Sequence, residues 1–361
     1  MRRSNRDRRR LLALVTIALS LLSACSNRPL VPYGETSTPL LLVPLSKVGV
    51  EDDRAYFRHL LCEVNRQVGA QLPDHRSCDD LLVRVGTEPS GVFPPLARGR
   101  SDWGLQIVFV PGLGWDCLQN YVDESSMLAH VEELGYRVSI AALEGLSSSA
   151  RNAELLNSHL MAIGASAANA VVLVGYSKGV PDILELLQLY PQWRSAVRAV
   201  VSIAGAVGGS PLADHTSINA LRAFQWVPGA ECPDGDGGAL DSLSSETRRQ
   251  WLVDHPLPAG INYYSLVTYP QPANISRGLR SHYKKLSRVD ARNDSQLIFY
   301  DQILPAGKLL GFVNADHLAI AVPVARTHRF IGSTVLNHNA FPREVMMEAV
   351  LRYLERELPG Q

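Results

Sequence analysis

The feature that most constrains this fold is a regular alternation of short apolar runs with segments of helical periodicity, which begins near residue 104. Six runs have the length and composition of strands: 105–110, 137–142, 170–174, 197–205, 262–268 and 308–313. Helical spacing of apolar residues predicts helices at 122–134, 152–163, 180–190 and 342–357. Strands and helices that alternate in this way form a mostly parallel central sheet with helices on both faces, an α/β fold. The strands are almost continuously apolar, which is typical of a sheet covered on both sides.

The alternation defines the domain organisation. Residues 104–361 are predicted to form the α/β domain, and residues 46–103 a small N-terminal region with a helix within 51–68. The pattern stops at about 211–258, a polar segment rich in Gly, Pro, Asp and Ser that ends in a predicted helix at 245–253. An insertion of this length is often a lid or a binding loop, and a plain surface excursion is the alternative.

The N-terminus has the three parts of a secretory signal. Six arginines lie within residues 1–10, an apolar run covers 11–22, and the sequence Leu22-Ser23-Ala24-Cys25 follows. The apolar run is too short to span a bilayer comfortably. Residues 1–24 are therefore predicted to be a signal peptide, and residues 25–45, which are rich in Pro, Ser and Thr, a tether.

The end of this signal resembles the cleavage box of bacterial lipoproteins. The resemblance implies that the Cys25 thiol carries a diacylglycerol and that Cys25 becomes the first residue of the mature chain. Ser26 rather than an Asp follows it, which favours the periplasmic face of the outer membrane. An ordinary signal with a chance Cys is the alternative. Residues 8–12 also resemble a twin-arginine signal, so the sequence leaves Sec and Tat export open.

The charge balance changes once the signal is set aside. The whole chain has 35 basic and 35 acidic residues, but residues 1–24 contain six arginines and one acid. From Cys25 onward there are 29 basic and 34 acidic residues, a formal charge of −5. This balance argues against a nucleic-acid partner and against docking on an anionic membrane by charge. Membrane attachment would have to come from the acyl chains on Cys25.

Four cysteines remain after Cys25, and an oxidising compartment would permit disulfides between them. We favour Cys62–Cys78, because the two residues are close in sequence and flank a turn-rich stretch. Cys117–Cys232 would then tie the loop after the first core strand to the insertion. Four inert buried thiols are the alternative. The sequence has no zinc-site spacing, so we expect neither a metal nor another cofactor.

The strongest chemical signal is Gly175-Tyr176-Ser177-Lys178-Gly179, which joins the strand 170–174 directly to the helix 180–190. A G-x-S-x-G motif places Ser on a strained strand-to-helix turn, where the two glycines let strand and helix approach closely. The helix N-terminus then points at developing negative charge. We predict that Ser177 is a nucleophile, with a simple Gly-rich turn as the alternative.

With this motif the chain resembles the α/β-hydrolase superfamily, particularly its lipase and esterase branches, over about residues 104–357. The resemblance implies a second oxyanion donor in the loop Val110-Pro111-Gly112-Leu113-Gly114, where Pro111 replaces the usual His. Mapped onto this sequence, the family's two oxyanion donors are the backbone N–H groups of Leu113 and Lys178. A Gly-rich turn without a catalytic role is the alternative. Lys178 replaces the commoner Met, Gln, His or Leu of the family, which is expected to alter the local pocket.

The resemblance also implies a base on the loop after the last strand. His317 directly follows the strand 308–313 and matches that position. His328 and His338 lie further along the chain and have no strand before them.

Three aspartates are candidates for the acid. Asp294 lies in a polar turn 23 residues before His317 and resembles the family's acid segment. Asp301 is the rival, in a segment that resembles an extended strand, and Asp290 comes third. The role is the same for each, since an ionised carboxylate orients the imidazole and stabilises its charged form.

These residues predict a serine hydrolase that cleaves carboxylic esters through an acyl-enzyme, with a small-molecule or lipid acyl ester as substrate. An acyltransferase, a thioesterase or a peptidase could use the same triad. A non-catalytic binding scaffold of the cell envelope is the alternative from another class.

Overall fold

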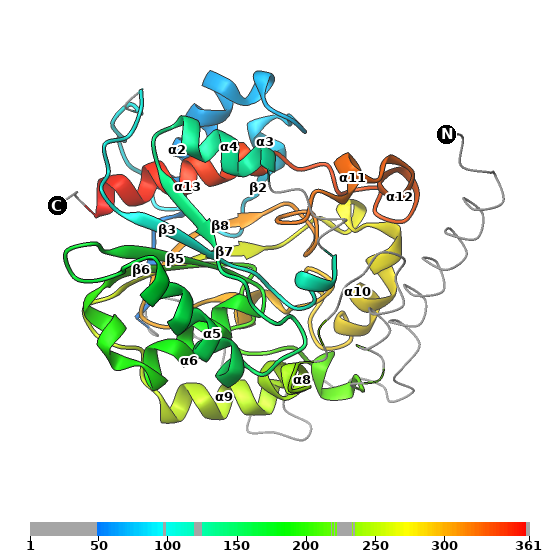
Figure 1. The fold of residues 1–361 in the computed structure, drawn as a ribbon. Helices are drawn as coiled ribbons and strands as arrows, with labels where there is room; N and C mark the ends of the chain where they lie inside the picture. The colour runs from blue at the N-terminus through cyan, green and yellow to red at the C-terminus, as the bar shows by residue number, and fades with distance from the viewer. Residues whose placement is uncertain are drawn as a thin grey trace, which may run out of the picture.

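An eight-stranded sheet runs through the molecule, and its neighbouring strands are parallel in the order β1-β8-β7-β6-β5-β3-β4 (Figure 1). The eighth strand, the short β2, lies off this path and pairs antiparallel with β8. The strands are β1 Glu51–Asp52, β2 Leu82–Val83, β3 Gln106–Val110, β4 Arg137–Ile140, β5 Val171–Tyr176, β6 Val197–Ile203, β7 Asn262–Thr268 and β8 Lys308–Val313. The computed structural model describes residues 49–358 except 97–98, 119–124, 218, 220, 222–232 and 234.

Helices cover both faces of the sheet, with α2, α4 and α13 on one side and α5 and α6 on the other (Figure 1). The helices are α2 Arg54–Val68, α3 Cys78–Leu81, α4 Ser125–Glu133, α5 Ser149–Ala162, α6 Gly179–Leu189, α8 Ala239–Leu243, α9 Ser245–Asp254, α10 Arg280–Leu286, α11 Val324–Thr327, α12 Arg329–Thr334 and α13 Arg343–Glu357. None of the helices in the described ranges is long and apolar enough to cross a membrane.

The two layers follow from the alternation of side chains along each strand. In β3, Ile107 and Phe109 belong to the core beneath α2 and α13, whereas Val108 and Val110 belong to the core beneath α5 and α6. Successive side chains of a strand point to opposite faces, so an uninterrupted apolar strand supplies both cores at once. The predicted α/β fold is confirmed, with a mostly parallel sheet that is buried on both sides.

The strands predicted from residue 104 onward match β3 to β8 within a few residues, and the helix predicted at 245–253 matches α9. The prediction did not include β1 and β2, which have two residues each and exist only through pairing with β8. The segment around Asp301 was expected to be extended, and this was wrong, because Phe299–Gln302 forms a 3-10 helix.

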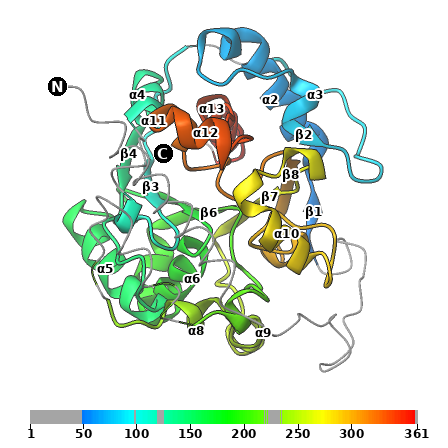
Figure 2. The same cartoon turned by 90° about the vertical axis from the view of Figure 1, so that its right-hand side faces the viewer.

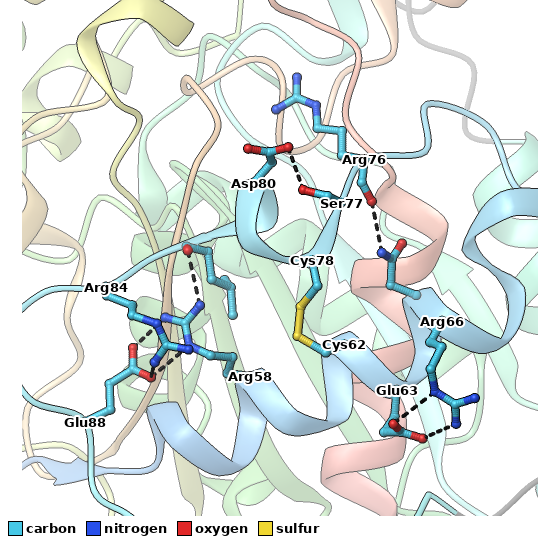
Figure 3. The surroundings of a disulfide bond; sticks show 12 residues. Arg58, Cys62, Glu63, Arg66, Arg76, Ser77, Cys78, Asp80, Arg84 and Glu88 are labelled. Carbon is cyan, nitrogen blue, oxygen red and sulfur yellow. Dashed lines mark hydrogen bonds and ion pairs between the residues drawn. A yellow bond between two sulfur atoms is a disulfide. The ribbon is translucent and has the colours of Figure 1, made fainter.

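The N-terminal region from residue 49 to 96 packs on the same sheet. Helix α2 contacts β8 and α13, and α2, α3 and β2 lie beside β8 (Figure 2). The disulfide Cys62–Cys78 joins α2 to α3, with 5.3 Å between the two Cα atoms (Figure 3). The favoured pairing is therefore confirmed.

The remaining sequence predictions on cysteines and termini meet the limits of the described chain. Cys117 is also disulfide-bonded, but Cys232 lies outside the described residues, so its pairing stays a prediction. The predicted signal peptide 1–24, the tether 25–45 and Cys25 also lie outside them.

The described parts of the insertion 211–258 lie against the layer of α5 and α6. Helices α8 and α9 are next to α6 in both views (Figures 1 and 2). Trp251 of α9 donates a hydrogen bond from Nε1 to the Glu185 carboxylate of α6 at 2.6 Å.

Candidate active site

The residues predicted to act together come from loops at the carboxyl ends of the parallel strands. Ser177 directly follows β5, the loop with Leu113 follows β3, and His317 follows β8. In open α/β sheets this edge is where ligands bind, because the loops that leave adjacent strands converge there.

Ser177 lies in the strained turn between β5 and α6. Its φ is +53°, a left-handed conformation that is costly for a residue with a side chain. A Cβ at Gly175 would come within 2.8 Å of side-chain atoms of Val180 and Ile183. A Cβ at Gly179 would overlap the carbonyl oxygen of Val110 in β3. Both glycines are thus required by the close approach of α6 to the sheet.

His317 bridges Ser177 and Asp294. Its Nε2 lies 2.9 Å from Ser177 Oγ, and its Nδ1 lies 2.7 Å from Asp294 Oδ2. The backbone N–H of His317 also donates to the carbonyl of Asp294 at 3.1 Å. All three side chains are buried or nearly so, which shields this hydrogen-bonded chain from water.

The Asp294 carboxylate is fully buried and saturated with donors. Oδ1 accepts from the backbone N–H groups of Gln296 at 2.9 Å and Leu297 at 2.7 Å. Oδ2 accepts from the Thr268 hydroxyl and from Gln302 Nε2 in addition to His317. Thr268 and Gln302 were not predicted, since nothing in their local sequence indicates that β7 and the 3-10 helix meet at Asp294.

The other candidates lie elsewhere. Asp301 lies 3.9 Å from the Arg249 guanidinium, and Asp290 pairs with Arg292 at 2.6 Å. Neither carboxylate contacts the imidazole of His317, whose two ring nitrogens are occupied by Asp294 and Ser177.

The two other histidines considered from the sequence, His328 and His338, contact neighbours outside this arrangement. His328 Nδ1 contacts the Thr327 hydroxyl at 3.0 Å, and the backbone of His338 donates to Ser276 Oγ at 3.3 Å.

The loop after β3 lies directly against the serine. A Cβ at Gly112 would come within 2.9 Å of Ser177 Cβ, so only a glycine allows this approach. Leu113 follows Gly112 in this loop, and Lys178 follows Ser177. Their backbone N–H groups are the two predicted oxyanion donors. Among the described residues neither N–H has a hydrogen-bond acceptor, which leaves both available to a ligand.

Two buried groups that the sequence analysis missed hold the histidine loop. Tyr176 donates from its hydroxyl to the carbonyl of His317 at 2.7 Å, and burial raises the pKa of this phenol well above its usual value. Asp316 accepts from the backbone N–H groups of Ser276 and Ala319, both at 2.9 Å. Burial raises the pKa of Asp316, while the hydrogen bond from Ser276 opposes that shift.

The Lys178 side chain does not form a pocket wall. It is fully buried, and its Nζ lies 2.8 and 3.0 Å from the two carboxylate oxygens of Asp182, one turn along α6. The residue that departs from the family's common choices therefore carries an internal ion pair.

The described residues include no cluster of three or more His, Cys, Asp or Glu side chains that could hold a metal ion.

Comparison with known structures places this geometry in context. The structure of a metagenomic carboxyl esterase, MGS0156, is 38% identical, covers 89% of this chain and 97% of its own, and superposes with a TM-score of 0.82. The chain belongs to the lipase and esterase family of α/β-hydrolases. The protein is thus an ester-bond hydrolase.

More distant structures share the fold of the hydrolase. The mature lipase BlEst2 of Bacillus licheniformis is 21% identical, covers 66% of this chain and 93% of its own, and has a TM-score of 0.50. EstA of Clostridium botulinum is 14% identical, covers 93% of this chain and 97% of its own, and has a TM-score of 0.51. No protein-family model matches the sequence. No curated protein sequence matches it either.

Proposed function

We propose that the protein hydrolyses carboxylic esters through an acyl-enzyme on Ser177, with His317 as general base and acid and Asp294 as the orienting carboxylate. The observation that carries this proposal is the unbroken hydrogen-bonded chain from Ser177 Oγ through both ring nitrogens of His317 to Asp294. That order of groups is what nucleophilic acyl transfer requires.

The chemical steps follow from this order. Ser177 Oγ attacks the ester carbonyl while its proton moves to His317 Nε2, and the carbonyl oxygen becomes an oxyanion. The tetrahedral intermediate then expels the alcohol, which takes the proton from Nε2 and leaves the acyl group on Ser177. Water attacks this acyl-enzyme by the same route and releases the carboxylic acid.

The oxyanion is assigned to the N–H groups of Leu113 and Lys178. Donors aimed at the developing charge lower the barrier because they need no rearrangement during the reaction, and losing one typically costs about 2.7–4 kcal/mol. The glycine at position 112 supports this assignment, since it lets the loop approach Ser177 to contact distance.

An apolar acyl group is supported by the surroundings of Leu113. This side chain packs between two clusters to which the insertion contributes apolar residues. One cluster contains Leu243 and Ala213, and the other contains Leu221 and Ala239. The insertion therefore brings apolar surface to the loop that would hold the ester carbonyl, which suits lipid or other acyl esters.

The proposal is tested with a fluorophosphonate probe and a panel of p-nitrophenyl esters. Wild type should be labelled, and Ser177→Ala should be neither labelled nor active. Folded wild type that stays unlabelled would contradict the serine mechanism. Rates that rise with acyl-chain length would support an apolar acyl site, whereas activity on acetate alone would contradict it. Product analysis with an added alcohol separates hydrolysis from acyl transfer.

We further propose that the protein is exported and anchored by lipid on Cys25, at the periplasmic face of the outer membrane. The signal at residues 1–24 supports export. The disulfide Cys62–Cys78 adds support from a distant part of the chain, because such bonds persist in oxidising compartments. The test is incorporation of labelled palmitate into wild type and its loss in Cys25→Ala, with membrane fractionation beside it.

A further inference from the structure

The search for further function leads to the buried ion pair behind Ser177. Lysine is almost never fully buried unless it is paired, because its charge is expensive to remove from water. Here the Nζ of Lys178 contacts both oxygens of the Asp182 carboxylate, and both side chains are only 1% exposed. The same residue carries, on its backbone, one of the two proposed oxyanion donors.

Asp182 is itself held from a neighbouring helix. Its Oδ2 accepts a hydrogen bond from Nδ2 of Asn152 in α5 at 2.8 Å. Asn152 in turn binds the main chain of Glu144: its Nδ2 donates to the carbonyl at 3.1 Å, and its Oδ1 accepts from the N–H at 3.1 Å. A chain of buried polar contacts thus connects Lys178 to the backbone at Glu144.

The loop that carries the second donor ends at the adjacent residue. Gly114, next to Leu113, donates its N–H to the carbonyl of Gly145 at 3.2 Å. The N–H of Gly145 in turn donates to Oδ2 of Asp116, in the same loop as Gly114, at 3.0 Å. A Cβ at Gly145 would overlap Gly114, so the two backbones are in direct contact.

The two proposed donors therefore share one support. Gly145 holds the Leu113 side through the backbone, and Glu144 holds the Lys178 side through Asn152 and Asp182. The two N–H groups are 65 positions apart in sequence, and oxyanion stabilisation is sensitive to where its donors are placed.

We propose that Asp182 and Asn152 are positioning residues. They tie Lys178 to Glu144, next to the Gly145 that holds the loop of Leu113, and so keep the two N–H groups at a set distance. The inference rests on the proposed function, since it refines how the same site would stabilise its oxyanion. Their contribution is to the transition state rather than to substrate binding.

The test compares two asparagines on α5. Asn152→Leu removes the link between Asp182 and Glu144. Asn157→Leu is the matched control, because Asn157 accepts a hydrogen bond from Trp193 Nε1 at 2.8 Å on the same helix but belongs to no part of the network. A second variant, Lys178→Met with Asp182→Leu, removes both charges together and leaves no buried charge unpaired.

Each variant is measured for kcat, KM, melting temperature and affinity for an alkylboronic acid, with active enzyme counted by fluorophosphonate titration. The boronic acid forms a tetrahedral adduct with Ser177 and reports on the oxyanion donors. We expect Asn152→Leu to lower kcat about tenfold, below the 10²–10³-fold loss for removing a donor outright. KM should change less than threefold, and boronate affinity should fall by the same factor as kcat. Asn157→Leu should keep kcat within twofold.

The proposal is overturned if Asn152→Leu and the double variant keep kcat and boronate affinity within threefold of wild type. It is also overturned if neither variant yields folded protein, because the network would then act on stability alone. If only the double variant fails to fold, Asn152→Leu decides. Ser177→Ala, assayed in parallel, separates failure of the proposed function from failure of the positioning role. If Ser177→Ala stays active, the proposed serine mechanism fails, whatever the positioning variants do.

Discussion

At the scale of single residues, the site is built from groups whose neighbours are distant in sequence. Ser177 and His317 are 140 positions apart, and Thr268 and Asp294 are 26 apart. The geometry assigns Asp294 rather than Asp301 to the imidazole, because only Asp294 contacts it.

Asp294→Asn should reduce kcat by about 10³–10⁴-fold, since an amide at this position favours the wrong imidazole tautomer and cannot stabilise the imidazolium. Asp301→Asn is the comparison and should leave kcat within a few fold. Steady-state kinetics on a p-nitrophenyl ester measures both. Full activity of Asp294→Asn together with loss in Asp301→Asn would reverse the assignment.

Thr268→Val should lower kcat by about tenfold, because the Asp294 carboxylate loses a hydroxyl donor and hydrogen bonds to charged groups contribute about 1.5–3 kcal/mol. Thr268→Ser keeps the hydroxyl and should stay within twofold of wild type. The kcat of both variants should be measured at the same pH. Equal activities would show that the hydroxyl has no part in holding the acid.

At the scale of elements, close contacts between backbones decide where the strand-to-helix turn lies. Helix α6 begins at Gly179, against the carbonyl oxygen of Val110 in β3. A side chain at this position would push α6 away from the sheet. The glycines of the motif are thus a packing requirement as well as a requirement of the strained serine.

Gly179→Ala should therefore destabilise the fold by about 1–3 kcal/mol, the usual cost of overpacking. Gly104→Ala is the control, because a Cβ there would meet nothing within 4 Å and the backbone has no positive φ. Urea unfolding followed by circular dichroism gives both values. A Gly179→Ala protein as stable as Gly104→Ala would contradict the packing argument.

At the scale of the whole molecule, the N-terminal region is tied to the hydrolase core at several points. It pairs two short strands with β8, whose end leads to His317. Arg326 of α11 binds Asp74 of this region at 2.7 Å and Glu344 of α13 at 2.5 Å. The stability of the site therefore depends on segments at both ends of the described chain.

Replacing both Cys62 and Cys78 by Ser should lower stability by about 3 kcal/mol, because the bond closes a short loop and restricts the unfolded chain. The midpoint of thermal unfolding should fall, while kcat at 25 °C stays close to wild type. Reduction of the wild type with dithiothreitol should lower the midpoint at least as far, because the reagent also reduces the disulfide of Cys117. An unchanged midpoint in both experiments would contradict this prediction.

Glu344 should make the folding stability of the protein sensitive to acid. Burial alone would raise the pKa of this carboxyl, but hydrogen bonds from Arg326 and Ser126 outweigh it and hold the pKa below its usual range. A carboxyl whose pKa is lower in the folded than in the unfolded protein stabilises the folded state at pH values above its unfolded pKa, about 4.3. This stabilisation is lost as the pH falls through the folded-state pKa.

Glu344→Gln should therefore unfold more readily than wild type at pH 7, with a smaller difference below about pH 4. The exposed Glu154→Gln is the control and should follow wild type at every pH. Denaturant unfolding from pH 7 to pH 3 measures these curves. A constant gap between Glu344→Gln and wild type across this range would contradict the linkage.

Much of the architecture was predictable from local sequence. Strands β3 to β8 and the turn at Ser177 are visible as apolar runs and a glycine-framed motif, because their signals lie within a few neighbouring residues. The position of His317 was predictable too, since it follows a recognisable last strand. The short strands β1 and β2 were not predictable, because two residues are too few to show an alternation of apolar and polar side chains.

The sequence by itself determined the parallel sheet, its two buried faces and the turn that presents Ser177, since these depend on periodicity and on glycines next to the serine. Only the tertiary structure decided which aspartate meets His317, what surrounds its carboxylate, and that Lys178 points inward to Asp182. Those outcomes depend on contacts between segments tens to hundreds of residues apart. Local sequence does not encode such contacts, because they form only when the sheet brings its loops to one edge.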